Sequence, residues 1–305
     1  MYAREVRGPA RRTVLALGAG TALAALPLGA TASASAAPAR SRAVDRRLSD
    51  LEQEHHARLG VFGRNLRTGE TVVRRADERF PMCSVWKTLA AAAVLRDLDR
   101  HGEFLAERIH YTEADLVSYS PVTGTPEHLS GGMTVAELCA AAVSISDNTA
   151  ANLLLRELGG PPAVTRFARS VGDPTTRLDR WETELNSAEP WRVEDTTSPR
   201  AIATTCARLV VGRVLGRPDR ERLATWMRNS ATNGQSFRAG LPADWTIADK
   251  TGSGEYGTNN DVGVTWTTDG TPIVLAVLTT HQDASSAADY PLVAAAAGLL
   301  AEALG

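Results

Sequence analysis

The chain has 305 residues, of which 43% are hydrophobic and 22% are charged, and its formal net charge is −2. This apolar content is enough for one large or two medium hydrophobic cores. The charge balance lacks the basic surplus of a nucleic-acid-binding protein, so we expect a small-molecule partner and no nucleic acid.

The first 36 residues are predicted to be an export signal that is removed. Arg11 and Arg12 precede a moderately apolar run at 16–30, and small residues at 32–37 provide a cleavage site after Ala36. The run is too short and too rich in glycine for a stable membrane span, so we expect no lasting membrane association. The arginine pair favours a twin-arginine signal, and a general secretory signal is the alternative.

Both ends of the remaining chain carry strand patterns. Residues 43–59 have leucines and charges at helical spacing, and the runs 60–66 and 69–73 then predict two strands joined by a turn. Three further strands are predicted at 246–253, 261–267 and 272–280. A helix rich in alanine and leucine closes the chain at 289–304, with Asp289 as its N-cap.

The middle of the chain has helical patterns. Thr134 and Glu137 have the spacing of a capping box at the start of one helix. Other helices are expected at 150–158, 162–171, 198–209 and 218–227. Residues 180–195 show little periodicity, and a segment of this length without regular structure is typical of a functional loop.

This order of elements indicates an α/β (α+β) fold in which one sheet is assembled from both chain ends around a helical insertion. We assign residues 37–80 and 220–305 to a discontinuous α/β domain. Residues 81–219, which include the loop at 180–195, are assigned to an all-α domain.

The stretch Ser84-Val85-Trp86-Lys87 opens a run rich in alanine and leucine, which are strong helix formers. Ser84 is therefore expected in the first turn of a buried helix, where unpaired backbone N–H groups point toward any nearby charge. Residues at i and i+3 share a helix face, so the side chains of Ser84 and Lys87 are expected to meet. A partly desolvated lysine can take a proton from a hydroxyl, although a helix cap beside a solvated lysine would have the same sequence.

Lysine is scarce in this chain. Of its 33 basic residues only Lys87 and Lys250 are lysines, and the others are arginines. Because arginine supplies the ordinary surface cations, the two lysines mark places where a titratable ammonium is required. The second lysine stands in Lys250-Thr251-Gly252.

Ser146-Asp147-Asn148 lies between two predicted helices, where a cap would have the same composition. The order Ser-x-x-Lys, Ser-Asp-Asn, Lys-Thr-Gly nevertheless resembles the class A β-lactamases and penicillin-binding proteins. Residues 115–123, 132–139 and 195–199 match that family further, and the resemblance extends from about Val44 to the C-terminus. It implies an antiparallel sheet with flanking helices and an active site between the sheet and the all-α part.

The resemblance implies catalytic roles for five residues, which are Ser84, Lys87, Ser146, Glu182 and Lys250. Ser84 would attack the carbonyl of a β-lactam and become acylated. Ser146 would pass a proton to the departing nitrogen, with Lys87 and Lys250 lowering the cost of that transfer. The backbone N–H groups of Ser84 and Ser253 would hold the oxyanion.

The remaining motif residues are implied to bind the substrate. Asn148 would hold the side-chain amide, and Thr251 with Ser253 would hold the carboxylate. Gly252 would let the substrate lie close along its strand, and Tyr119 would form an aromatic wall at the mouth of the cleft.

The expected loop carries Glu182 and Asn186 in the spacing Glu-x-Glu-Leu-Asn. This resembles the loop by which class A enzymes place a carboxylate and an amide around a water, with Glu182 as the general base. Arg180 and Asp195 stand at the loop ends, where the family has a salt bridge. The chain departs from the family at Thr183. Many relatives have a proline at this position, and the peptide bond that precedes this proline is often cis.

A second departure concerns the carboxylate-binding arginine of many relatives. Asn259 stands at its usual position, and Ser236 stands where other relatives supply it. The group that replaces this arginine is not evident from the sequence. The six histidines show no metal-ligand spacing, so we expect no metal. We also expect no cofactor and a monomeric protein.

We therefore expect a secreted serine β-lactamase that hydrolyses penicillins and cephalosporins through an acyl-enzyme on Ser84. A penicillin-binding DD-peptidase is one alternative, but it would not need Glu182 and Asn186. A penicillin-sensing module that stays acylated is the other alternative, and the altered loop leaves it open.

Overall fold

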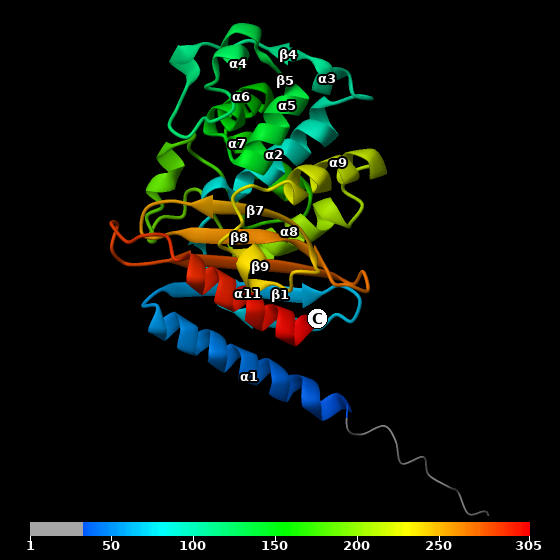
Figure 1. Ribbon diagram of the computed structural model, residues 1–305, viewed down its shortest axis with the longest axis vertical. Coiled ribbons are helices and arrows are strands. Elements are labelled where there is room, and N and C mark those ends of the chain that lie inside the picture. Colours follow the sequence, from blue (N-terminus) through cyan, green and yellow to red (C-terminus); the bar gives the residue numbers. More distant parts are fainter. Residues whose placement is uncertain (1–32) are drawn as a thin grey trace, which may run out of the picture.

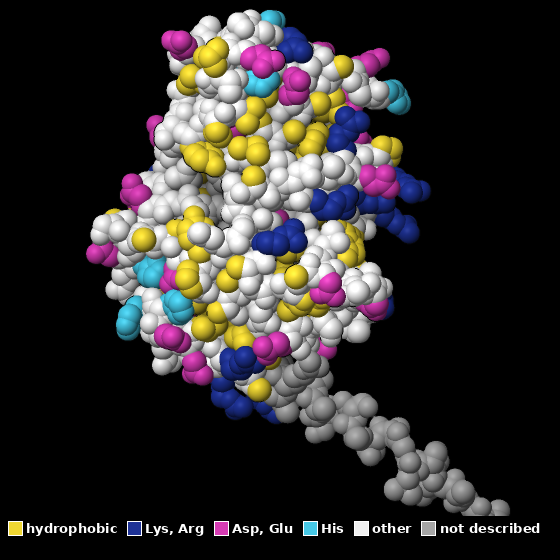
Figure 2. Space-filling model, viewed as in Figure 1, with side chains coloured by type: hydrophobic (Ala, Val, Ile, Leu, Met, Phe, Trp, Pro, Cys, Tyr) yellow, Lys and Arg dark blue, Asp and Glu magenta, His cyan; other side chains and the backbone are white. Residues whose placement is uncertain are grey.

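The computed structural model describes residues 33–305, with side chains from Arg42 onward. Residues 1–32 of the expected export signal lie outside this range, and its last residues, 33–36, open helix α1. None of the helices in the described range combines the length and the apolar character needed to cross a membrane. On the face shown in Figure 2, acidic and basic side chains are interspersed.

A five-stranded antiparallel sheet with the order β2-β1-β9-β8-β7 forms the centre of one half of the molecule. Its strands are β1 Arg58–Asn65, β2 Thr71–Arg74, β7 Thr246–Ser253, β8 Asn259–Trp266 and β9 Pro272–Thr280. Both ends of the chain thus contribute to one sheet, as expected from the sequence. The expected bounds of β7 and β9 are confirmed, and β8 begins two residues earlier than predicted.

Two small two-stranded ladders lie outside this sheet. They pair β3 Phe80–Pro81 with β6 Thr196–Thr197, and β4 Arg108–Ile109 with β5 Met133–Thr134. The first of these joins the segment before Ser84 to the far end of the predicted loop.

Helices form much of the rest of the described chain. They are α1 Ser33–Glu54, α2 Lys87–Ala93, α3 Glu103–Ala106, α4 Pro126–Gly131, α5 Val135–Ala140, α6 Asn148–Leu158, α7 Pro162–Ser170, α8 Pro199–Val210, α9 Arg217–Arg228, α10 Phe237–Gly240 and α11 Tyr290–Leu304. The capping box of Thr134 and Glu137 is confirmed, and Asp289 caps α11 by accepting from the N–H of Leu292.

The predicted helix at 43–59 was wrong at its C-terminal end. Helix α1 ends at Glu54, His56 has a left-handed φ of 48°, and strand β1 begins at Arg58. Leu59 belongs to the sheet because its side chain is fully buried there, and its N–H donates to the Glu52 carboxylate at 3.1 Å. The helical spacing of Leu59 is therefore coincidental.

The sheet lies between two helical layers (Figure 1). Helices α1 and α11 cover one face, where an apolar core forms around Leu48, Leu275 and Leu300. Helix α8 packs on the other face, and its core continues into the helical half around α2. Since α8 lies within 81–219 but packs on the sheet, the domain bounds assigned from the sequence stay a prediction.

Candidate active site

Ser84 lies where the helical half meets the sheet. A short 3-10 helix, Cys83–Trp86, leads directly into α2, and its residues are buried against β7. Gly252 on β7 permits this approach, because a Cβ there would lie 2.8 Å from Met82 O and 3.0 Å from Ser84 N. The sequence predicted that Gly252 gives access to the substrate, whereas the structure shows that its first effect is close packing against the Ser84 backbone.

Ser84 and Lys87 do not bond to each other directly, in contrast to the sequence prediction. Both instead contact Oε1 of Glu182, from Ser84 Oγ at 3.3 Å and from Lys87 Nζ at 3.2 Å. The Glu182 carboxylate thus bridges the Ser84 hydroxyl and the Lys87 ammonium.

Lys87 is fully buried and bonded on several sides. Its Nζ donates to Asn148 Oδ1 at 2.5 Å, to the backbone O of Ser146 at 2.9 Å and to Ser146 Oγ at 3.3 Å. Burial lowers the pKa of Lys87, although the nearby Glu182 carboxylate opposes this. A lysine in this state can exchange a proton with a hydroxyl more readily than a solvated lysine can.

Ser146 receives hydrogen bonds from both lysines of the chain. Lys250 Nζ donates to Ser146 Oγ at 3.0 Å and to its own neighbour's carbonyl, Thr251 O, at 2.8 Å. Burial, and then the positive charge of Lys87, lower the pKa of Lys250 to about 7. Ser146 holds a left-handed φ of 67° at the end of the turn before α6, which turns its hydroxyl toward both ammonium groups.

Asp147, the middle residue of its motif, has a structural position that the sequence analysis did not examine. Its buried carboxylate caps α6 through the N–H of Ala150. It also accepts from the N–H groups of Val122 and Thr123 and from the Thr123 hydroxyl. Asp147 therefore fixes the segment after Tyr119 to the start of α6.

The loop at 180–195 brings a carboxylate and an amide to the site. Asn186 Nδ2 donates to Glu182 Oε2 at 2.6 Å, and the side chain of Glu182 is fully buried. The Glu182–Thr183 peptide bond is cis. Arg180 and Asp195 form the expected ion pair at the loop ends, with Arg180 Nε 2.6 Å from Asp195 Oδ2.

Asn152 is a buried residue that the sequence analysis missed. Its Nδ2 donates to Glu182 O at 2.8 Å, and its Oδ1 accepts from Glu182 N at 3.1 Å. A signal was present, because Asn152 lies four residues after Asn148 and therefore on the same helix face as that motif residue. Its partner could not be found from the sequence, because the two residues lie 30 positions apart.

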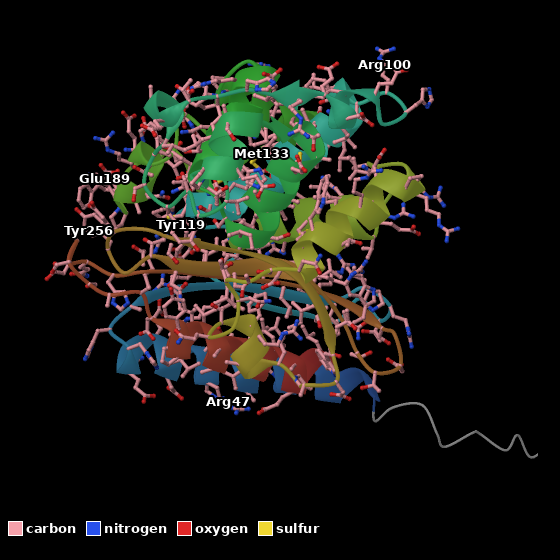
Figure 3. All side chains as sticks on the ribbon, turned by 45° about the horizontal axis from the view of Figure 1, so that its top comes forward. Arg47, Arg100, Tyr119, Met133, Glu189 and Tyr256 are labelled. Atoms are coloured by element: carbon pink, nitrogen blue, oxygen red, sulfur yellow. The ribbon has the colours of Figure 1, made fainter. Side chains whose placement is uncertain are left out.

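A cleft of about 400 Å³ opens above these groups. It is lined by Ser84, Ser118, Tyr119, Ser146, Asn148, Thr183, Asn186, Thr232, Thr251, Gly252, Ser253 and Tyr290. Tyr119 is more than half exposed, on the same side of the molecule as Glu189 and Tyr256 (Figure 3). The predicted binding residues thus share one cleft, to which Thr232 and Tyr290 are unpredicted additions.

All residues that line the cleft are uncharged, and both lysines lie beneath its surface. The positions of the missing arginine are buried as well. Ser236 Oγ and both polar atoms of the Asn259 side chain have no hydrogen-bond partner among the described residues. Thr232 Oγ1 and Thr251 Oγ1 are 2.6 Å apart, so this part of the cleft presents hydroxyl groups.

Comparison with known proteins agrees with this geometry. The model of a family described as "Beta-lactamase enzyme family" matches residues 43–304. A β-lactamase of Streptomyces lavendulae is 62% identical over 97% of this chain and 98% of its own length. A β-lactamase of Streptomyces fradiae is 61% identical, with 99% of each chain covered.

A solved structure of a β-lactamase from Streptomyces albus G has the same fold. Its TM-score is 0.85 and its sequence identity 60%, and the match covers 86% of this chain and all of that one. A β-lactamase structure from Desulfarculus baarsii matches with a TM-score of 0.84 at 46% identity, covering 87% of this chain and 98% of that one. The chain therefore belongs to the β-lactamase enzyme family and is a class A serine β-lactamase.

Proposed function

We propose that this β-lactamase forms an acyl-enzyme on Ser84, which Glu182 then hydrolyses through a bound water. The contacts of the Glu182 carboxylate carry this proposal: one oxygen lies 3.3 Å from Ser84 Oγ, and Asn186 holds the other at 2.6 Å. A carboxylate and an amide next to the nucleophile can orient a water toward the ester carbonyl. An enzyme that stays acylated would not need this pair.

In the acylation step, Ser84 Oγ would attack the lactam carbonyl while its proton passes to the Lys87–Glu182 pair. The 3.2 Å contact between Lys87 Nζ and Glu182 Oε1 supports a proton that moves between them. Ser146 would then protonate the departing nitrogen, because its Oγ accepts from both lysines and can be reprotonated by either. The N–H groups of Ser84 and Ser253 would bind the oxyanion.

The substrate would lie along β7 in the uncharged cleft. Thr251 and Ser253 would bind the carboxylate of the β-lactam, with the buried charge of Lys250 behind them. Asn148 would hold the side-chain amide, and Tyr119 would cover the mouth of the cleft. We expect penicillins and cephalosporins as substrates, no metal or cofactor, and a monomeric enzyme.

Two variants test the acyl-enzyme. Ser84→Ala should form no covalent adduct with benzylpenicillin, while Glu182→Ala should accumulate a stable one that intact-protein mass spectrometry detects. A Glu182→Ala variant with full turnover would overturn the role of Glu182. A wild-type protein that accumulates adduct without turnover would favour the penicillin-sensing alternative.

The proposal includes export through a twin-arginine signal, supported by Arg11 and Arg12 before the apolar run. Changing both arginines to lysine keeps the charge but removes the pair. We expect β-lactamase activity to disappear from the culture supernatant while the protein remains in the cells. Unchanged secretion would instead indicate the general secretory route.

A further inference from the structure

Asp249 on β7 and Asp261 on β8 form a buried pair of carboxyl groups on the face of the sheet that carries α10 and α11. Thr251 pairs with Asp261 and Asp249 with Gly263, so the two aspartates are diagonal neighbours in the antiparallel ladder. Both side chains are fully buried. Asp249 immediately precedes Lys250, whose side chain leaves the strand on the opposite face.

Each of these carboxyl groups has one oxygen with a donor from the protein. Asn233 Nδ2 donates to Asp249 Oδ1 at 2.8 Å, and the N–H of Phe237 donates to Asp261 Oδ2 at 3.1 Å. The second oxygens, Asp249 Oδ2 and Asp261 Oδ1, have no other donor among the described residues. The partner that each of these oxygens lacks can be supplied by the other carboxyl group, its diagonal neighbour in the ladder.

A hydrogen bond between the two carboxyl groups requires a proton on one of them, because an ionised carboxylate can only accept. Two adjacent ionised carboxylates without solvent would also repel each other strongly. Burial raises the pKa of Asp261, and the charge of Asp249 raises it further. The proton therefore belongs mainly on Asp261, while Asp249 accepts from Asn233 and from Asp261.

Lys250 needs a negative charge that its direct contacts do not supply. Among the residues that the structure describes, its Nζ bonds only to the hydroxyl of Ser146 and the carbonyl of Thr251, whereas Lys87 has Glu182 at 3.2 Å. Burial and Lys87 both lower the pKa of Lys250, while Asp249 and Asp261 raise it.

The other charged or titratable groups around the pair are few. Arg238 of α10 favours the ionised form of Asp249. Glu182, which lies in the active site with Lys250, favours the charged form of Lys250. The thiol of Cys206 on α8 also senses the pair, and burial raises its pKa, so it stays neutral.

We propose that Asp249 and Asp261 share one proton and that the single negative charge left on the pair is the buried counter-charge of Lys250. Neither aspartate lines the cleft, so they are positioning residues that act through Lys250. The part of this inference that concerns substrate binding rests on the proposed role of Lys250. The shared proton itself does not depend on that role.

Infrared difference spectroscopy tests the proton directly. Asp261→Asn reproduces the protonated state, because its amide can donate to Asp249 Oδ2 and accept from Phe237 N–H. At neutral pH the wild-type protein should show the C=O stretch of a protonated carboxyl group, and Asp261→Asn should lose it. A wild-type protein without this band, or a variant that keeps it, would overturn the shared proton.

Asp173→Asn is the matched control for this measurement. Asp173 is also buried, but its two oxygens accept from the N–H groups of Thr175 and Thr176 and from the hydroxyls of Thr176 and Thr205. A carboxylate with four donors has no need of a proton. The band should therefore remain in Asp173→Asn.

The counter-charge is tested by the pH dependence of KM for benzylpenicillin. Asp261→Asn keeps one negative charge, so the pH at which KM begins to rise should match that of the wild type. The double variant Asp249→Asn/Asp261→Asn has no charge there, and the rise should begin about one pH unit lower. A double variant that folds and shows no shift would overturn the counter-charge. The infrared result decides the shared proton even if KM shows no dependence on Lys250.

Discussion

Asn152 holds the backbone of Glu182 from both sides. Its side-chain amide donates to the Glu182 carbonyl at 2.8 Å and accepts from the Glu182 N–H at 3.1 Å. Because Asn152 lies on the buried face of α6, these bonds tie the loop glutamate to the helical half of the molecule. The position of the carboxylate over Ser84 thus depends on a residue that touches neither the carboxylate nor the cleft.

Asn152→Ala should slow deacylation more than acylation. The substitution leaves the buried N–H and C=O of Glu182 without partners, at a cost of about 1–3 kcal/mol for each group. With benzylpenicillin in excess, mass spectrometry should detect more acyl-enzyme at steady state than in the wild type. Asn229→Ala, an exposed amide at the end of α9, serves as the control. Equal acyl-enzyme fractions in wild type and Asn152→Ala would contradict the prediction.

Replacing Lys87 by arginine should nearly abolish activity, because a guanidinium cannot act as a base at neutral pH. Lys250→Arg keeps a permanent positive charge beside Ser146 and should retain part of its activity. The measurement is kcat for both variants, with circular dichroism to verify that these buried positions still allow folding. If Lys87→Arg keeps more than about a tenth of kcat, a loss below about 1.4 kcal/mol, its proton-transfer role is wrong.

KM for benzylpenicillin should rise with pH above about 7. The pKa of Lys250 is lowered to about 7, so the side chain is charged below this pH and neutral above it. A neutral Lys250 no longer attracts the substrate carboxylate, which remains ionised throughout the range. In Lys250→Arg the charge persists, and KM should stay flat between about pH 6 and 9. A flat wild-type profile would mean that Lys250 does not titrate in this range.

Asp195→Asn should destabilise the protein. Asp195 is buried and accepts from Arg180 Nε and from the N–H groups of Asp179 and Arg180. Removing one partner of a buried ion pair costs about 3–5 kcal/mol, which we expect to lower Tm by several degrees. Glu221→Gln is the control, because its pair with Arg217 is exposed and contributes at most about 1 kcal/mol. Equal Tm values in both variants would show that the loop is closed by other contacts.

Introducing an arginine at position 236 or 259, where the family's carboxylate-binding arginine is missing, should strengthen substrate binding. A charge-assisted hydrogen bond contributes about 1.5–3 kcal/mol, and the cleft lining holds no cation. We expect Asn259→Arg or Ser236→Arg to lower KM for benzylpenicillin at least about fivefold, with kcat little changed if ground and transition states gain equally. A parent KM already in the low micromolar range, or no decrease in either variant, would mean that the hydroxyl groups already bind the carboxylate well.

Much of the sheet could be predicted because runs of apolar and β-branched residues stand between turn residues in the sequence. The bounds of β7 and β9 follow from this signal, and they match the structure. The error at Leu59 arose because leucine suits a helix and a strand equally, and only its burial in the sheet decides between them. Sequence pattern thus located the elements but not every boundary.

The part of the site that the three sequence motifs supply could be predicted from the sequence. Ser84, Lys87, Ser146 and Lys250 were identified by type and order, and the structure brings them together through Glu182 and Ser146. Asn152 and Asp261 were missed because the sequence does not show which distant group an Asn or Asp side chain bonds to. Which carboxyl group carries a proton depends on burial and neighbours, and neither is encoded in local spacing.

The strand order has a consequence for the emerging polypeptide during synthesis. Strand β1 is made early, but the register pairs Arg58 with Thr280, so its neighbour β9 is made only near the end. A nascent chain that stops before Thr246 already contains Ser84, Lys87, Ser146 and Glu182 but lacks three strands of the sheet. Contacts between such distant segments form late, so we expect this fragment to have no reactivity toward penicillin. We therefore expect Ser84 to become reactive only after strands β7, β8 and β9 have been synthesised and have joined the sheet.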